Sequence, residues 1–108
     1  MNPHFQKARF TLYHGNSLEI LPQLPKESFD MIYADPPYRL SNGGFTSENG
    51  KVVSVNKGEW DKSEGVQKDF EFHKAWIGEC KRLLKPDGTI WVSGTYHNIY
   101  KCGYALEL

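Results

Sequence analysis

Apolar residues along the first third of the chain alternate with turn residues in a way that predicts a strand, a short helix and a second strand. Residues 10–13 are a short β-prone run that ends at a His-Gly-Asn turn. Ser17 is a suitable N-cap for a short helix after that turn. Residues 29–34 hold four consecutive apolar residues, which indicates a strand buried on both faces. This strand must stop at the following Asp-Pro-Pro-Tyr, because proline cannot continue a central strand.

The rest of the chain has a polar middle and an apolar-periodic end. Residues 39–68 are polar and rich in glycine, and we expect a long mobile loop there. A helix is predicted next, because apolar side chains recur every four residues at Phe72, Trp76, Cys80 and Leu84. A turn at 86–88 leads into a strand at 89–93, and Asn98 is placed to cap a last helix that runs to Leu106.

Alternating strands and helices predict an α/β fold with a parallel sheet and flanking helices. Three strands make a small sheet, and few elements remain to cover it, so we expect a fragment of a larger domain or half of an assembly. Ligands of such sheets bind beyond the carboxyl ends of the strands. Polar clusters follow all three predicted strands, at 14–16, 35–38 and 93–97.

The tetrapeptide at 35–38 combines a carboxylate, two prolines and a tyrosine, which is more than a turn requires. Asp35 offers a carboxylate, and Pro36 has a fixed φ and a carbonyl held in place, so together they could accept both hydrogens of a planar amino group. Such a grip frees the nitrogen lone pair of a nucleobase amine for attack. Tyr38 adds a flat face on which a base could stack, an interaction worth roughly 1–3 kcal/mol. The pattern therefore favours chemistry on an exocyclic amino group.

Composition narrows the class of protein. Thirteen basic residues balance thirteen acidic ones in 108 residues, which argues against nucleic-acid binding by bulk charge but leaves room for a local basic face. No apolar run is long enough to span a membrane, and no secretory signal is visible. The two cysteines, Cys80 and Cys102, are therefore expected to be reduced thiols of a cytoplasmic protein.

The tetrapeptide after an apolar strand resembles the catalytic motif of amino-group DNA methyltransferases, which transfer methyl from S-adenosylmethionine. The likeness extends over residues 11–106 and is greatest to accessory adenine methyltransferases of GATC-type restriction systems. Further similar segments are the loop after the motif (41–44, 52–55 and 58–62), a helix-turn-strand (84–91) and a cleft-lining stretch (97–100).

The resemblance implies a partial Rossmann-like methyltransferase fold. Only 34 residues precede the motif, and they contain no Phe-x-Gly-x-Gly. The chain therefore resembles the N-terminal, catalytic part of a permuted β-class enzyme, without the target-recognition region and the Gly-rich cofactor loop. We expect little activity from this chain alone, and a C-terminal polypeptide or second subunit would complete the fold.

The resemblance also implies roles for individual residues. Asp35, Pro36, Pro37 and Tyr38 would be catalytic, with Tyr38 stacking on an adenine flipped out of the duplex. Asn16 stands where the family usually has an acid near the cofactor's adenine, so Asn16, Asp35 and Pro36 would contact S-adenosylmethionine. The DNA contacts would be Tyr38, Asn42, Trp60 and His97. No metal is required.

Other interpretations of these residues stay open or are weaker. Trp60 is either a loop anchor or a DNA contact, and Lys81, Arg82 and Lys85 are a solvated helix end rather than a phosphate site. His73 and Cys80 lie on different faces of the predicted helix, which disfavours a zinc site. The alternatives to adenine N6 methylation are a DNA- or subunit-binding fragment without catalysis, and a methyltransferase for cytosine N4 or RNA. Because the family usually has Ser in place of Asp35 for cytosine N4, adenine is favoured.

Overall fold

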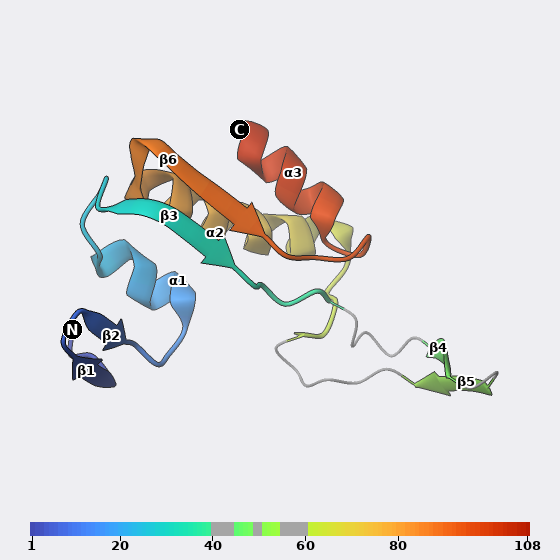
Figure 1. Cartoon of the computed structure of the whole chain (residues 1–108). Helices are drawn as coiled ribbons and strands as arrows, with labels where there is room; N and C mark the ends of the chain where they lie inside the picture. Colours follow the sequence, from blue (N-terminus) through green and yellow to red (C-terminus); the bar gives the residue numbers. More distant parts are fainter. Residues whose placement is uncertain (40–44, 49–50, 55–60) are drawn as a thin grey trace.

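The computed structural model of the chain describes residues 1–39, 45–48, 51–54 and 61–108, with the backbone alone for 45–48 and 51–54 (Figure 1). The elements follow one another as β1 (Phe5–Lys7), β2 (Phe10–Leu12), α1 (Ser17–Ile20), the 3-10 helix η1 (Leu21–Gln23), β3 (Phe29–Ala34), β4 (Phe45–Glu48), β5 (Lys51–Ser54), α2 (Val66–Leu83), β6 (Leu84–Val92) and α3 (Ile99–Glu107).

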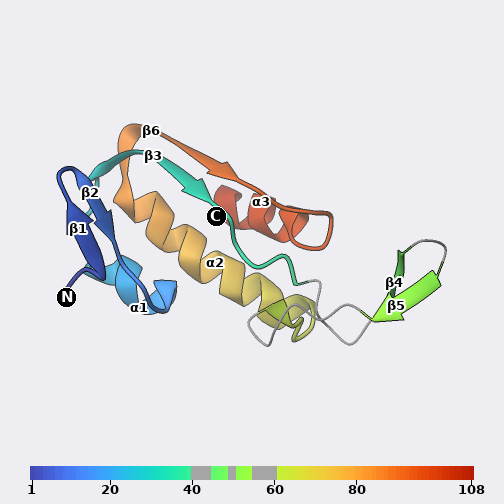
Figure 2. The ribbon, with the colours of Figure 1, turned by 60° about the horizontal axis from the view of Figure 1, so that its bottom comes forward.

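The centre of the fold is a parallel pair of strands backed by two helices. β3 and β6 run side by side in one direction, in a register that pairs Met31 with Thr89 and Ala34 with Val92. The long helix α2 connects the two strands, and α3 lies next to α2 on the same side of the pair (Figures 1 and 2). The predicted α/β architecture with a parallel sheet and flanking helices is confirmed. Both strands end at the same edge, which brings their carboxyl ends together.

The first predicted strand does not join this sheet. β2 pairs antiparallel with β1, and the register places Phe5 opposite Leu12. A two-residue turn in which Ala8 has a φ of 54° folds the chain back on itself, and the His4 amide donates to the Leu12 carbonyl at 2.7 Å. The expectation of three parallel strands was therefore wrong for the described residues, because local hairpin pairing takes up the backbone groups of β2.

Helix α2 ends one residue before the predicted stripe does. Its buried face consists of Asp69, His73, Trp76, Ile77, Cys80 and Leu83. Leu84 turns to an extended conformation and becomes the first residue of β6, opposite Phe29. Phe72, which the stripe also included, is only half-buried and packs at the edge of the core. The period of the stripe was right, and Trp76 and Cys80 lie at the centre of the buried face.

Strand β6 is longer than predicted, because it absorbs the expected turn as a bulge. Phe29 pairs with Leu84 and Met31 already pairs with Thr89, so residues 85–88 bulge out of the ladder. Gly88 makes this possible: a Cβ there would lie 2.9 Å from the Leu84 side chain and 3.1 Å from the Asp30 carbonyl. A glycine is required at this close approach.

The core lies between the helices and one face of the sheet. Trp76, Ile77, Cys80, Cys102 and Ala105 form its buried centre, and Ile32, Ala34, Ile90 and Val92 pack against it from the strands. Side chains of a strand alternate between faces, so the intervening residues point the other way. Met31, Tyr33 and Trp91 are 56%, 65% and 64% exposed. The prediction that residues 29–34 are buried on both faces was therefore wrong, because α2 and α3 cover a single face.

Local details also differ from the sequence-based expectations. The N-cap of α1 is Asn16 rather than Ser17, since the Asn16 Oδ1 accepts the Leu18 amide hydrogen at 2.9 Å. Asn98 precedes α3 as expected, but its side chain accepts from the Thr95 amide instead of capping the helix. Within 39–68, expected to be a loop, β4 and β5 form an antiparallel hairpin. None of the described helices combines the length and apolarity needed to cross a membrane.

Candidate functional site

The predicted catalytic tetrapeptide lies where β3 ends. Asp35 directly follows the last residue of the strand, and Pro36 cannot donate a ladder hydrogen bond, so the chain leaves the sheet there. The Asp35 side chain is exposed, whereas Pro36, Pro37 and Tyr38 are half-buried. A buried carboxylate under packed side chains would have left no access for a substrate. The exposure of Asp35 therefore agrees with a role in binding.

Ser93, which no motif singled out, completes a cluster of three oxygen atoms with Asp35 and Tyr38. The Ser93 hydroxyl donates to the Asp35 Oδ1 at 2.6 Å, and the Tyr38 hydroxyl approaches the same oxygen at 2.8 Å. The two hydroxyl oxygens lie 3.0 Å from each other. The available signal was the polar cluster at 93–97, because its first residue directly follows the strand that pairs with β3.

These contacts determine the ionisation of the cluster. The hydrogen bond from Ser93 and then that from Tyr38 hold the pKa of Asp35 below its ordinary value. Ser93 also acts to lower the pKa of Tyr38, but the bond to the Asp35 carboxylate and desolvation outweigh it, so the pKa of Tyr38 is raised. At neutral pH the cluster therefore consists of a carboxylate that only accepts hydrogen bonds and two neutral hydroxyl groups.

A pocket of about 220 Å³ opens next to the tetrapeptide. Asp35, Pro36 and Pro37 form one wall of it, and Ser17 with Leu21 forms another. Helix α2 contributes the remaining wall through Phe72, Trp76 and Cys80. The lining is mostly apolar, with one carboxylate at the edge, which is the usual character of a small-molecule site. The pocket is smaller than the roughly 300–1,000 Å³ that encloses a whole drug-sized ligand.

A second acceptor is placed beside the carboxylate. Within the described residues, no hydrogen bond occupies the carbonyl of Pro36 or the Oδ2 atom of Asp35. Both residues line the same pocket. Two neighbouring residues of the tetrapeptide thus each keep an oxygen acceptor without an internal hydrogen bond in the part of the chain that the structure describes.

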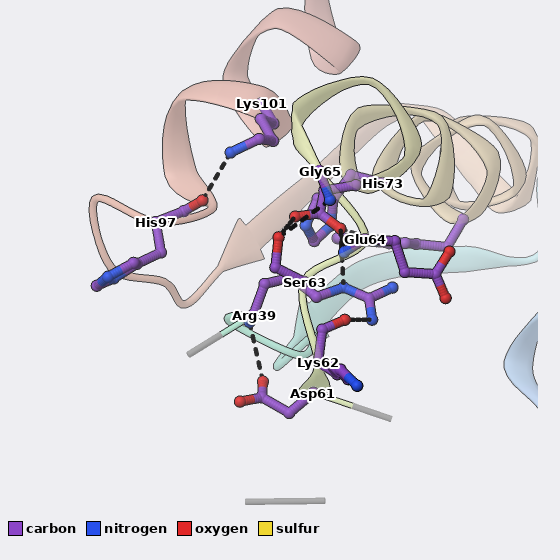
Figure 3. A network of polar contacts seen from close by, with 11 residues as sticks. Arg39, Asp61, Lys62, Ser63, Glu64, Gly65, His73, His97 and Lys101 are labelled. Carbon is purple, nitrogen blue, oxygen red and sulfur yellow. Dashed lines mark hydrogen bonds and ion pairs between the residues drawn. The ribbon is translucent and has the colours of Figure 1, made fainter. Parts of the chain in front are cut away.

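Arg39 ties the end of the tetrapeptide to the start of α2 (Figure 3). Its amide donates to the Asp61 Oδ1 at 2.9 Å, and its Nη1 donates to the Lys62 carbonyl at 3.0 Å. The Nε atom lies 3.8 Å from the Asp69 Oδ1, and the guanidinium sits 4.4 Å from the centre of the Phe72 ring. Arg39 has a left-handed φ of 60°, which costs an L-residue about 1–2 kcal/mol. These contacts hold it in that conformation.

Asp69 is the acceptor at the centre of this network. It is 3% exposed, and it receives hydrogen bonds from the Ser63 hydroxyl at 2.6 Å and the Glu64 amide at 3.0 Å. Asp61 is buried as well, at 1% exposure. Asp69 thus pairs with the Arg39 guanidinium, whereas Asp61 bonds to the Arg39 backbone amide. The available sequence signal for this cluster was the presence of polar residues on the inner face of a predicted helix.

The other predicted site residues lie apart from the cluster. Asn16 uses its side-chain oxygen to cap α1, next to Ser17 in the pocket wall. His97 stacks on Tyr96 at 4.1 Å, and its imidazole points away from the Arg39 network in Figure 3. Its carbonyl accepts from the Lys101 ammonium at 2.8 Å. Asn42 and Trp60 lie outside the described residues.

Comparison with known proteins adds a family match. Residues 29–107 match the family described as DNA methylase (N6_N4_Mtase). This segment begins with β3 and contains the tetrapeptide, α2, β6 and all of α3.

Individual relatives match over nearly the whole chain. The type II methyltransferases M2.DpnII of Streptococcus pneumoniae and M2.LlaDCHI of Lactococcus lactis subsp. cremoris are each 49% identical to it over 97% of its length. The type II methyltransferase M2.MboI of Moraxella bovis is 44% identical over 99% of it. The chain spans only 39–40% of the length of these relatives.

Proposed function

Since this chain belongs to the DNA methylase family, we propose that it carries the amine-binding site of an S-adenosylmethionine-dependent methyltransferase acting on adenine N6 in DNA. The observation that carries the proposal is the pair of oxygen acceptors on Asp35 and Pro36, which line one pocket at the end of β3 and have no internal hydrogen bond among the described residues. The three relatives are type II methyltransferases by name, which supports a place in restriction-modification.

The chain's own residues would act by holding the amine. The carboxylate of Asp35 accepts one hydrogen of the adenine amino group, and the Pro36 carbonyl accepts the other. Both acceptors draw the nitrogen away from planarity, so its lone pair points toward the incoming methyl group. The nitrogen would form its bond to the methyl carbon in line as the bond from that carbon to the sulfonium sulfur breaks, which leaves a neutral thioether. The nitrogen would then release one proton to water. Because the reacting atoms are held in position, orientation supplies much of the rate.

The pocket beside Asp35 fits part of the methyl donor. When bound, S-adenosylmethionine supplies the methyl group and carries a positive charge on sulfur. A carboxylate at the edge of a mostly apolar pocket suits that charge, and Asp35 is ionised at neutral pH because its pKa is lowered by Ser93 and Tyr38. The pocket is too small for the whole molecule, so we propose that these residues hold only the end that carries the methyl group. Asn16, beside the pocket wall, keeps its proposed contact with the cofactor.

Four residues are proposed to contact DNA. Tyr38 is half-buried and hydrogen-bonded through its hydroxyl, so a flipped base would stack on its ring rather than bond to its tip. Asn42, Trp60 and His97 remain proposed DNA contacts through the family resemblance. We also propose that the protein acts in the cytoplasm. Its relatives come from bacteria, and bacterial DNA lies in that compartment.

A chimera provides the test. The present chain replaces the matching N-terminal part of the Streptococcus pneumoniae relative, and the product is incubated with labelled S-adenosylmethionine and duplex DNA. We expect N6-methyladenine in the nucleoside digest and its loss in Asp35→Ala. Asp87→Ala is the matched control, because this exposed carboxylate lies at the other end of β6. A folded chimera that yields N4-methylcytosine, or no methylated base while the intact relative is active, refutes the proposal.

A second polypeptide is the favoured partner, because the sheet is open on one face. Phe29, Met31, Tyr33 and Trp91 are exposed there, and the relatives continue well beyond the part that this chain matches. We propose that a C-terminal polypeptide covers this face. The chain alone should show little methylation, and mixing it with the remaining part of the relative should restore activity. Trp91→Asp should weaken that restoration, whereas Tyr104→Asp, an exposed position on α3, should not. Clear methylation by the chain alone, lost in Asp35→Ala, contradicts this proposal.

A further inference from the structure

Ser93 is held rigidly at the point where the two parallel strands end. Its amide donates to the Ala34 carbonyl at 3.0 Å, which extends the β3–β6 ladder by one residue. Ala34 directly precedes Asp35, so the two side chains emerge from neighbouring positions of the same sheet edge. Side chains fixed to strands are placed more accurately than those on loops. The backbone therefore places Ser93 beside Asp35, and its hydroxyl contacts the Asp35 Oδ1 at 2.6 Å.

The hydrogens available to the cluster limit what each contact can do. Asp35 is ionised, so the three oxygen atoms share only the hydrogens of Ser93 and Tyr38. Either both hydroxyls donate to Oδ1, or Tyr38 donates to Ser93 and Ser93 donates to Oδ1. Ser93 also lies 3.3 Å from the Ala34 carbonyl, a longer alternative. In both arrangements that use the shortest contact, Ser93 donates to the Asp35 Oδ1.

We infer that Ser93 is a positioning residue for the transfer proposed above: it occupies Oδ1 of Asp35 and so leaves Oδ2 as the oxygen that receives the substrate amine. Without Ser93, only the longer 2.8 Å contact from the Tyr38 hydroxyl would hold Oδ1, and the carboxylate would be oriented less tightly. The hydroxyl of Ser93 does not touch the substrate. It acts through Asp35, and the lowered pKa of that carboxyl is a second consequence of the same bond.

The test measures Asp35 directly in the 108-residue chain by carbon-13 NMR of the carboxyl group during a pH titration. Ser93→Ala should raise the pKa of Asp35 and allow its side chain to average between rotamers. Ser93→Thr, which keeps a hydroxyl, should restore both toward the wild-type values. Ser28→Ala is the matched control, because that hydroxyl bonds the Pro25 carbonyl away from the site.

An unchanged pKa and an unchanged rotamer of Asp35 in Ser93→Ala would overturn the inference. If the alanine variant does not fold, Ser93→Cys takes its place, because a thiol is a weak donor of similar size. An Asp35 that titrates as in wild type in that variant overturns the inference equally.

A second readout separates this inference from the proposed function on which it rests. In the chimera, Ser93→Ala should lower kcat by roughly tenfold to a hundredfold through misalignment, with little change in KM for DNA. The acidic limb of the pH–rate profile should move to higher pH. If Ser93→Ala changes the NMR titration of Asp35 but the wild-type chimera methylates no DNA, the positioning role of Ser93 is supported and the proposed methyltransferase function is refuted. If the wild-type chimera methylates DNA and Ser93→Ala changes neither the NMR titration nor kcat, only the positioning role of Ser93 is refuted.

Discussion

His73 should make the stability of this protein depend on pH in a way that one substitution can isolate. Its imidazole is fully buried in α2, and its Nδ1 accepts the indole N–H of Trp76 at 3.0 Å. The neutral ring therefore carries its hydrogen on Nε2, for which the described residues provide no partner. Burial of the ring, and then the positive charge of Arg39, lower the pKa of His73 to about 4.

The sign and size of this pH dependence follow from the pKa of His73 in the folded and in the unfolded chain. The pKa of His73 is about 4 in the folded chain against 6.5 for the ordinary side chain, so the unfolded chain binds more protons between these values. The stabilisation from the neutral ring is fully present above pH 6.5 and is lost as the pH falls through the folded pKa. Between pH 7.5 and pH 5 the loss amounts to about 2 kcal/mol. This is a large fraction of the about 5–15 kcal/mol expected for a domain of this size.

Urea unfolding at pH 7.5 and pH 5, followed by tryptophan fluorescence, measures this difference. His73→Gln keeps an acceptor for Trp76 but does not titrate, so its free energy of unfolding should change about 2 kcal/mol less than that of wild type between the two pH values. Carboxyl groups titrate equally in both proteins and cancel. His14→Gln removes an exposed histidine and should behave as wild type. Equal losses of stability in wild type and His73→Gln would refute the reasoning.

Two further predictions concern buried groups. Asp69→Ala removes the acceptor for Ser63 and the partner of Arg39, so urea unfolding should show a loss of about 3–5 kcal/mol. The exposed Glu71→Ala should change stability by less than about 0.5 kcal/mol, and similar effects of both would contradict the role of the network. Burial raises the pKa of Cys80 and of Cys102 to about 11 each. Both thiols should therefore resist iodoacetamide at pH 8 in the folded chain and react in urea, and fast modification of the folded chain would contradict their burial.

Helices and strands with a regular apolar pattern could be predicted from the sequence. The place of the candidate site could be predicted too, because it follows from where parallel strands end. Asp35 lies at the end of a strand because two prolines follow it, and parallel strands bring their carboxyl ends together. The meeting of the 35–38 and 93–97 clusters could therefore be expected, although the contact of Ser93 with Asp35 could not. Side-chain distances across a sheet edge depend on register, and the bulge at Gly88 sets that register.

Other features lie beyond sequence patterns for identifiable reasons. The pairing of β1 with β2 depends on a turn in which a non-glycine residue, Ala8, takes a left-handed φ. Asn16 and Ser17 are both good caps, and only the backbone conformation decides between them. Asp69 and His73 lie on the inner face of α2, yet polar side chains at such positions are usually assigned to the surface. The contacts that accompany their burial are seen only in the structure: Ser63, Glu64 and Arg39 contact Asp69, and Trp76 donates to His73.

The Arg39 network has a consequence for how sequences of this kind can diverge. The Arg39 amide bonds to the Asp61 carboxylate, so the segment between them begins and ends at one fixed point of the domain. The entropy of closing such a ring grows slowly with its length, and doubling the number of residues between the two ends adds only about 0.6 kcal/mol to that cost. The length and sequence of that segment can therefore change during evolution, and its contacts can change with them, while Tyr38 stays at the sheet edge.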